Sequence, residues 1–471
     1  MTSSNPPKLF QPIKVGDVQL QHHIVLAPLT RLRANAKHVH GDLALDYYTQ
    51  RASTPGTLLI SEGTSLRAEA GGWSNEPHIH TDEQVAGWKR ITDAVHAKGS
   101  YMFCQIFAHG RAAYPEALEP LGYDIVGPSP IPIQGRPTPR ELTVKEIKEY
   151  VCWFAEAAHN AVHRAGFDGV EVHFANGYLL NQFIDDGSNH RTDEYGGSIE
   201  NRCRFPLEVL DAVVKTVGQS KVAFRVSPWE IFQDMGMKDP VPTYTYLIKK
   251  ILEDFPLLAY LHAIERRVKG VTVAGSNSED KEYDESKNFL RQLWKPRPFI
   301  SAGLFNRETA LERAETEGDL IAFGRLFISN PDLPLRLKKN LPLTPYNRET
   351  FYVPESPVGY IDYPFYTEEP VNGVDQLGWR LVASWRCRRF QLAFLCIRVR
   401  SQSCQSIRVR WTVNSPSCIR RASERRCGSN PSHDSNNRLL GSWYPTLSID
   451  IYTADDQSVV VVLRLNDMLH I

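Results

Sequence analysis

Eight short apolar segments recur between residues 20 and 335, and amphipathic stretches separate them. Each segment is continuous in apolar residues, as expected of strands that are buried on both faces. The stretches between them show helical periodicity, and one of them has Thr143 as an N-cap and Gly166 just after its end. The strand candidates are residues 23–30, 57–64, 101–107, 169–175, 222–228, 258–264, 297–303 and 320–325.

This alternation predicts an α/β fold, a single (β/α)8 TIM barrel. An open, doubly wound sheet is the competing architecture, but it usually carries a G-x-G-x-x-G motif after its first strand, and the sequence has none there. In a (β/α)8 barrel the chemistry takes place where the strands run into their following loops. We therefore expect functional residues in the strand ends "PLTR", "SEGT", "CQIF", "HFANGY", "FRVSP", "SAG" and "FGR".

The charge balance and the cysteine pattern argue against several classes of function. The 471 residues carry 54 basic and 54 acidic side chains, and a net charge of zero argues against a nucleic-acid-binding barrel. No apolar stretch approaches the length of a membrane span, and the start "MTSSNPPKLF" lacks the regions of a secretory signal, so a cytoplasmic protein is expected. None of the eight cysteines forms a C-x-x-C pair, and no metal site is predicted.

The composition changes after about Tyr366. Residues 380–427 contain twelve arginines and five of the eight cysteines, but one glutamate and no lysine or aspartate. We therefore predict a barrel domain over residues 1–366 and a poorly structured, Arg/Ser/Cys-rich C-terminal extension over residues 367–471. The extension is a basic disordered arm that contacts acidic partners or RNA, an added small domain, or the translation of an unspliced or frameshifted region. We favour the last, because it would give this composition without periodicity.

The segment "EVHFANGYLL" (171–180) places three polar side chains at the end of the fourth strand candidate. Taken singly, His173 is more often an ordinary hydrogen-bonded residue than a catalytic one, and Asn176 is more often a turn residue. Together they offer two hydrogen-bond donors that can converge on one acceptor, such as a carbonyl or phenolate oxygen. Tyr178 adds a proton donor with a reference pKa of about 10. Donors that polarise a carbonyl, beside an acid that protonates carbon, indicate a conjugate-addition site.

A second set of candidates lies at the ends of other strands. Gly303, Gly324 and Arg325 are either ordinary loop residues or a phosphate site made of backbone N–H groups and a guanidinium. Arg225 interrupts the apolar run "VAFRVSP", where a structural ion pair competes with a cofactor contact, and Gln105 is a buried amide that needs planar partners. As a set, these residues suit a large planar heterocycle with many hydrogen-bonding edges and a phosphate tail.

Ten segments of the chain resemble the Old Yellow Enzyme family of FMN-dependent NADPH dehydrogenases and ene-reductases, especially its fungal and plant members. The resemblance covers roughly residues 8–366. The segments are "LAPLTRLRA" (26–34), "YYTQRAS" (47–53), "SEGT" (61–64), "QIFAHGRAA" (105–113), "GFDGVEVHFANGYLLNQF" (166–183), "RTDEYGGSIENRCRF" (191–205), "FRVSPW" (224–229), "FGRLFISNPDLPLRL" (323–337), "RETFY" (348–352) and "GYIDYP" (359–364).

The resemblance implies a role for each candidate residue. His173 and Asn176 match the pair that holds the activating oxygen of the substrate, and Tyr178 matches the proton donor. For tightly bound, non-covalent FMN, Thr30 matches the residue that hydrogen-bonds the flavin carbonyl near N5, and Arg225 matches the positive charge near N1 and O2. The other matches are Gln105 to the pyrimidine edge, Gly63 to the backbone at the isoalloxazine, Gly303, Gly324 and Arg325 to the phosphate contacts, and Phe107, Phe232 and Tyr352 to the pocket wall. Phe107 stands where several relatives carry Trp, which implies a reshaped pocket.

The function implied by the resemblance is reduction of the activated C=C bond of an α,β-unsaturated carbonyl or nitro compound by a ping-pong mechanism. NADPH or NADH is the hydride donor, FMN passes the hydride to the β carbon, and Tyr178 protonates the α carbon. One alternative is a catalytically impaired flavin-binding barrel that acts through its basic tail as a binding protein. Another is an enal isomerase or reductase of secondary metabolism. The expected partner is a small molecule, and the expected assembly is a monomer or a homodimer.

Overall fold

Eight parallel strands close into a barrel in the computed structural model, which describes residues 6–264, 289–367, 447–453 and 459–465. They are β3 (Ile24–Leu26), β4 (Leu58–Ile60), β6 (Tyr101–Phe107), β9 (Gly169–Phe174), β10 (Val222–Val226), β11 (Leu261–Ile264), β12 (Phe299–Ala302) and β13 (Leu320–Phe323). Each strand pairs with the next along the chain, and β13 pairs with β3 to close the ring. The predicted (β/α)8 barrel is therefore confirmed.

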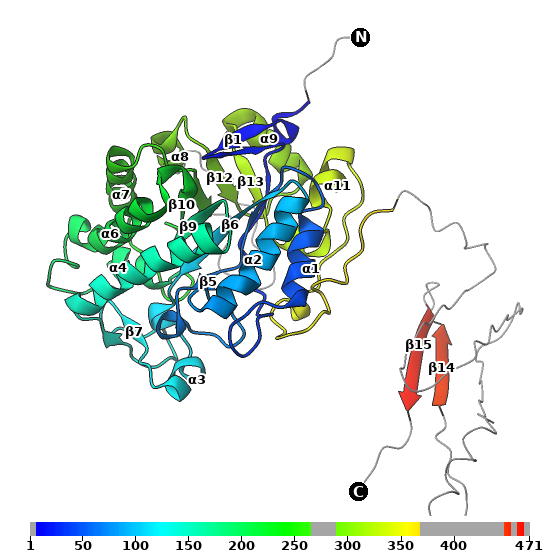
Figure 1. The fold of residues 1–471 in the computed structure, drawn as a ribbon, viewed down its shortest axis with the longest axis horizontal. Helices are drawn as coiled ribbons and strands as arrows, with labels where there is room; N and C mark the ends of the chain where they lie inside the picture. Colours follow the sequence, from blue (N-terminus) through cyan, green and yellow to red (C-terminus); the bar gives the residue numbers. More distant parts are fainter. Residues whose placement is uncertain (1–5, 265–288, 368–446, 454–458, 466–471) are drawn as a thin grey trace, which may run out of the picture. The chain divides into compact units, whose positions relative to one another are not determined.

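Helices alternate with these strands and cover the outside of the barrel (Figure 1). They are α1 (Asp42–Arg51), α2 (Asp82–Ala97), α3 (Pro115–Leu118), α4 (Val144–His159), α5 (Leu179–Ile184), α6 (Ile199–Val217), α7 (Val241–Asp254), α8 (Phe289–Trp294), α9 (Arg307–Glu317), α10 (Arg325–Ser329) and α11 (Leu333–Lys339). Short parallel pairings add β5 (Thr64–Ser65) beside β6, and join β7 (Val126–Gly127) to β8 (Arg140–Glu141).

The boundaries of α4 follow directly from the sequence. Thr143 accepts a hydrogen bond from the backbone N–H of Glu146, and the Glu146 carboxylate accepts one from the backbone N–H of Thr143. This capping box confirms the predicted N-cap. A single π turn, Asn160–Arg164, follows the helix. The segment then ends before Gly166, whose φ of 77° lies in the left-handed region that favours glycine.

The amino-terminal half of the barrel interior is filled with apolar side chains. Val25, Leu58, Phe103 and Ile300 are fully or almost fully buried there. An antiparallel hairpin of β1 (Ile13–Val15) and β2 (Val18–Leu20) packs its apolar residues into the same cluster. This hairpin was not predicted from the sequence. Because side chains fill this end, the described part of the barrel leaves room for a ligand at the carboxyl ends of its strands.

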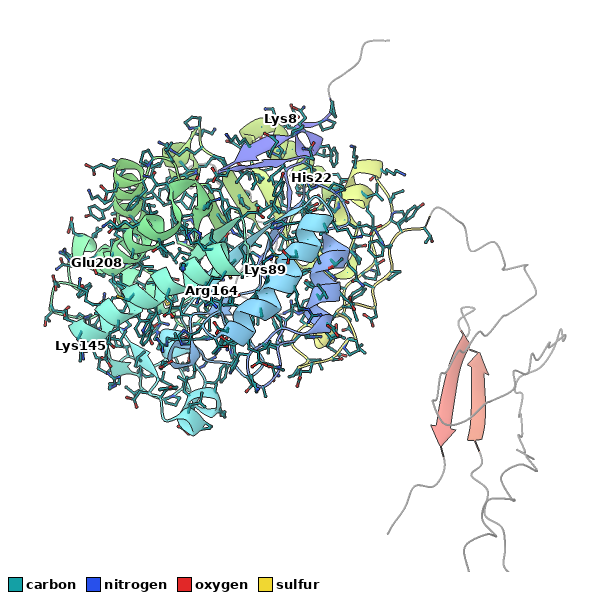
Figure 2. All side chains as sticks on the ribbon, in the orientation of Figure 1. Lys8, His22, Lys89, Lys145, Arg164 and Glu208 are labelled. Atoms are coloured by element: carbon teal, nitrogen blue, oxygen red, sulfur yellow. The ribbon has the colours of Figure 1, made fainter. Side chains whose placement is uncertain are left out.

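Charged side chains lie on the outer helices, as Lys89, Lys145, Arg164 and Glu208 show (Figure 2). Some form ion pairs between neighbouring elements, such as Lys148 of α4 with Glu208 of α6 at 2.8 Å. An exposed pair of this kind contributes only about 0–1 kcal/mol, so packing of the apolar faces holds the helices in place. Within the described residues, no helix has both the length and the apolar character needed to cross a membrane.

The chain divides into two compact units, Met1–Thr367 and Glu368–Ile471. In the second unit, the described residues form one antiparallel pair, β14 (Leu447–Thr453) with β15 (Val459–Leu465). These two strands were not predicted from the sequence. The Arg-rich and Cys-rich part of the predicted extension, and the interpretations attached to it, lie outside the described residues.

Candidate active site

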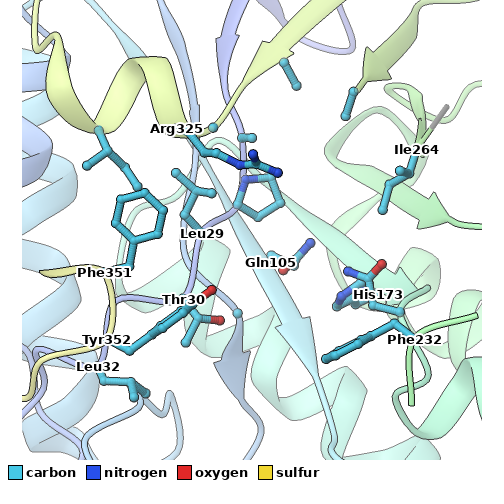
Figure 3. Close-up of a pocket in the computed structure, with 18 of the residues that line it drawn as sticks. Leu29, Thr30, Leu32, Gln105, His173, Phe232, Ile264, Arg325, Phe351 and Tyr352 are labelled. Carbon is cyan, nitrogen blue, oxygen red and sulfur yellow. The ribbon is translucent and has the colours of Figure 1, made fainter. Parts of the chain in front are cut away.

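A cavity of about 1000 Å³ opens at the carboxyl ends of the barrel strands. Figure 3 shows Thr30 and Tyr352 on one side of it and His173 with Phe232 on the other, with Gln105 and Arg325 between them. All thirteen predicted site residues line this cavity: Thr30, Gly63, Gln105, Phe107, His173, Asn176, Tyr178, Arg225, Phe232, Gly303, Gly324, Arg325 and Tyr352.

The turn after β9 brings His173, Asn176 and Tyr178 to one part of the cavity wall. His173 is the last residue of β9 whose side chain faces the barrel interior. Asn176 and Gly177 follow the strand with φ values of 59° and 75°. Side chains from neighbouring elements hold the turn: Ser227 Oγ accepts from the Asn176 N–H at 2.9 Å, and Asn181 Oδ1 accepts from the Gly177 N–H at 2.9 Å. The left-handed turn therefore reverses the chain within three residues and starts α5 immediately after Tyr178.

His173 is a neutral hydrogen-bonding group in this environment. It is 2% exposed, and its Nδ1 has no hydrogen-bond partner in the described part of the chain. Burial holds the pKa of His173 well below its ordinary value, and the positive charge of Arg225 adds to this effect. A neutral imidazole can donate one hydrogen bond to a substrate oxygen without transferring its proton.

Tyr178 is a protonated phenol enclosed by aromatic rings. Its ring lies edge-on to Phe107, with the centroids 4.8 Å apart, and to Trp73 at 6.1 Å. Burial raises the pKa of Tyr178 far above its ordinary value, and the negative charge of Glu76 adds to the rise. The hydroxyl therefore keeps its proton at neutral pH and is available as an acid at the cavity wall.

Arg225 places a buried positive charge on the cavity floor. Its exposed fraction is 8%, and its Nε has no hydrogen-bond partner among the described residues. Within the same residues, no carboxylate forms an ion pair with it, so the structural ion pair that competed with a cofactor contact is not seen. Gln105 of β6 also lines the cavity and donates its Nε2–H to Glu171 at 2.7 Å.

The end of the cavity near β12 and β13 contains Gly303, Gly324 and Arg325. At Gly324, an added Cβ would lie 3.0 Å from Leu29 Cδ2, so a larger residue would crowd the wall. The Arg325 guanidinium lies 3.5 Å from the Tyr346 hydroxyl. Backbone N–H groups and one guanidinium at this end are suited to a phosphate group.

Several aromatic residues of the wall were not predicted from the sequence. Trp73, Tyr346 and Phe351 line the cavity, but they lie in loops outside the eight strands. For Trp73 a usable signal existed, because "GGW" follows the second strand candidate at the expected end of the barrel. Tyr346 and Phe351 lie beyond the last barrel strand, where strand periodicity gives no information.

The residues present fit FMN. The cavity is large enough for a nucleotide-sized ligand, and Arg225 provides a buried cation with an unsatisfied donor. At Gly63, which also lines the cavity, an added Cβ would lie 3.0 Å from the ring of Phe107, so a larger residue would crowd this part of the wall. Thr30, Gln105 and Arg225 would contact the heterocycle, while Gly303, Gly324 and Arg325 would hold the phosphate.

The (β/α)8 barrel and the residues that line its cavity are those expected of an oxidoreductase that binds a flavin. Residues 8–344 match the NADH:flavin oxidoreductase / NADH oxidase family, and the chain belongs to that family. It is an NAD(P)H-dependent flavin oxidoreductase that uses FMN, as the resemblance to Old Yellow Enzyme implied.

Three proteins illustrate the similarity. Chanoclavine-I aldehyde reductase fgaOx3 of Penicillium roqueforti is 47% identical over 77% of this chain and 97% of its own length. The "probable inactive reductase easA" of Epichloe festucae var. lolii is 46% identical over 79% of this chain and 98% of its own length. The crystal structure of Old Yellow Enzyme from Pichia sp. AKU4542 has a TM-score of 0.70 and 37% identity, over 77% of this chain and 95% of that one.

Proposed function

We propose that this flavoprotein reduces the activated C=C bond of α,β-unsaturated aldehydes, ketones or nitro compounds, by a ping-pong reaction with NAD(P)H. In this proposal residues 1–366 form the FMN-binding domain. Bound FMN supplies the hydride chemistry that links NAD(P)H to the substrate. The similarity to a chanoclavine-I aldehyde reductase supports an aldehyde among the substrates.

The protein's own residues bind and polarise the substrate. Neutral His173 and Asn176 donate hydrogen bonds to the carbonyl or nitro oxygen, and these bonds strengthen as negative charge develops on it. Tyr178 transfers its hydroxyl proton to the α carbon of the substrate, and its phenolate then regains a proton from solvent. Phe107, Phe232 and Tyr352 form the wall that orients the substrate and excludes water.

One observation carries the proposal: a neutral imidazole, a carboxamide and a protonated phenol lie together on one wall of the cavity, supplied by the end of β9 and the turn that follows it. Two hydrogen-bond donors and one acid are the groups that a conjugate reduction requires. A barrel that only stored flavin would not need a buried phenol at this place.

Rapid mixing of the two half-reactions tests the role of Tyr178. We expect Tyr178→Phe to slow the oxidation of the enzyme by cyclohexenone at least about 100-fold, because general acid catalysis contributes that much. Reduction by NADPH should stay at the wild-type rate. Tyr195→Phe is the matched control, since Tyr195 is buried but its hydroxyl bonds Glu208 outside the cavity. An unchanged rate with cyclohexenone in Tyr178→Phe would contradict the proposal.

The similarity to a relative named a "probable inactive reductase" favours a second candidate, a flavin-binding barrel without turnover. Colour distinguishes the two. The active enzyme should be yellow, should bleach with NADPH without oxygen, and should regain its colour when cyclohexenone is added. A yellow protein that bleaches but does not recover would support the second candidate.

A further inference from the structure

A buried carboxylate, Glu171, lies beneath the cavity and has no part in the function proposed above. It precedes His173 by two residues on β9, so both side chains point into the barrel. Its exposed fraction is 0%. Gln105 of β6 donates Nε2–H to Glu171 Oε1 at 2.7 Å, and His262 of β11 lies with Nδ1 2.9 Å from Oε2. Glu171 therefore joins three strands under the cavity floor.

Glu171 is ionised and can only accept hydrogen bonds. Burial opposes its ionisation, but His262, Arg225 and Gln105 outweigh burial and hold the pKa of Glu171 below its ordinary value. Because a carboxylate has no proton to give, His262 must present its Nδ1–H. For the same reason, the amide of Gln105 must present its nitrogen to Glu171.

The orientation of Gln105 follows from this constraint. An amide has one donor end and one acceptor end. With Nε2 facing Glu171, the acceptor end, Oε1, is left for the cavity that Gln105 lines. Among the described residues, no group donates a hydrogen bond to this oxygen. The Glu171 carboxylate thus determines that a ligand bound beside Gln105 faces the hydrogen-bond acceptor Oε1 of that amide.

We propose that Glu171 is a positioning residue that sets the polarity of the flavin-binding edge. It turns the oxygen of Gln105 toward the single ring N–H of oxidised flavin, at N3, and it places a negative charge near Arg225. The inference rests on FMN binding in this cavity. It goes beyond the proposed function, because it concerns the properties of the bound flavin and holds whichever substrate is reduced.

Replacing the carboxylate by an amide should reverse this polarity. In Glu171→Gln, the new amide oxygen accepts from His262 Nδ1–H and the new amide nitrogen donates to Gln105. The amide of Gln105 then turns over, so that its Oε1 accepts from the new amide at position 171 and its Nε2–H faces the cavity. The other tautomer of His262 is disfavoured, because its Nε2 has no partner among the described residues and a buried N–H would stay unsatisfied there.

Two properties of the bound flavin report this change without measuring turnover. The first is the pKa of flavin N3–H, followed by absorbance during a pH titration. We expect Glu171→Gln to lower it by at least about one unit, because a donor replaces an acceptor and a negative charge is removed. The second is the reduction potential. The same substitution should shift the reduction equilibrium about tenfold toward reduced flavin, which is about 30 mV for a two-electron couple.

Glu76→Gln is the matched control. Glu76 is also a buried carboxylate bonded to a histidine, His109, at 2.6 Å, but it lies on the side of Tyr178. Glu76→Gln should leave both flavin properties unchanged. The inference is overturned if Glu171→Gln leaves both properties at wild-type values, or if Glu76→Gln shifts them equally.

Two further variants separate the causes. In Gln105→Met/Glu171→Gln the donor is absent, so the N3 pKa should lie above that of Glu171→Gln alone; equal values would overturn the part assigned to Gln105. If Glu171→Gln fails to hold FMN, Gln105→Met alone removes the acceptor and should lower the N3 pKa, and an unchanged value overturns the inference. A wild-type protein that binds no FMN would instead contradict the cofactor assignment.

Discussion

Gly177 joins the two substrate-facing residues Asn176 and Tyr178, and Gly177→Ala tests whether this turn sets the activity. Its φ of 75° lies in the left-handed region. An added Cβ would lie 2.9 Å from Gln233 Cβ and 2.9 Å from Met235 Cγ, closer than such atoms pack. The substitution therefore meets both a backbone and a packing penalty.

The size of the effect follows from these two contributions. A left-handed alanine costs about 1–2 kcal/mol relative to the right-handed region. Crowding against the loop that carries Gln233 costs about 1–3 kcal/mol if the loop and the turn stay in place. If the turn moves instead, the packing cost falls, but Asn176 and Tyr178 move with it. A displacement of about 1 Å at a catalytic group costs roughly 100-fold in rate.

Gly318→Ala provides the matched control. Gly318 ends α9 with a φ of 78°, and an added Cβ there meets no atom within 4 Å. Thermal unfolding and kcat/KM with cyclohexenone should be measured for both variants. We expect each to lose stability through backbone strain, and only Gly177→Ala to lose roughly 100-fold in kcat/KM. Equal kcat/KM in the two variants would refute the reasoning.

Two further substitutions test the core and the pocket wall. Burial lowers the pKa of His22 to about 4, and the charge of His23 adds to this. The His22 imidazole therefore binds a proton near pH 6.5 in the unfolded chain but not in the folded protein, so the free energy of unfolding should fall by up to about 3 kcal/mol from pH 6.5 to 4. Urea unfolding measured across this pH range should show that His22→Asn loses this contribution to the pH dependence of stability. The Phe107 ring packs edge-on against Tyr178 in the cavity wall, with the ring centroids 4.8 Å apart. Phe107→Trp should lower kcat/KM for a bulky bicyclic enone at least about tenfold relative to cyclohexenone, and an unchanged ratio would contradict that role.

The barrel could be predicted because its strands are buried on both faces and therefore form continuous apolar runs. Tyr101–Phe107 matches the predicted strand at both ends. The first strand is shorter than predicted, Ile24–Leu26 against 23–30, because the chain leaves the ladder there and its next residues line the cavity. The hairpin of β1 and β2 was missed, since two strands of three residues are too short for a periodic pattern.

The candidate site was predictable to the extent that its residues lie on strand ends. Polar side chains in otherwise apolar strands, such as Gln105 and Arg225, are conspicuous in a sequence because burial of an unpaired polar group is costly. Their partners are not conspicuous. Gln105 pairs with Glu171 across β6 and β9, whereas His262 lies opposite Arg225 in the ladder and still reaches the Glu171 carboxylate. Such a contact depends on strand register, which no local pattern contains.

The two-residue period of a strand explains why the cavity floor and the layer below it are both polar. On β9, Glu171 and His173 face the interior in succession, and on β6 Phe103, Gln105 and Phe107 do so. In each strand the inward residue nearer the amino end packs in the barrel interior or bonds the residues that line the cavity, and the inward residue nearer the carboxyl end contacts the ligand. Glu171 therefore acts on the ligand through Gln105 and not directly. A substitution at Glu171 should therefore change the N3 pKa and the reduction potential of the bound flavin while leaving the residues that contact the substrate in place.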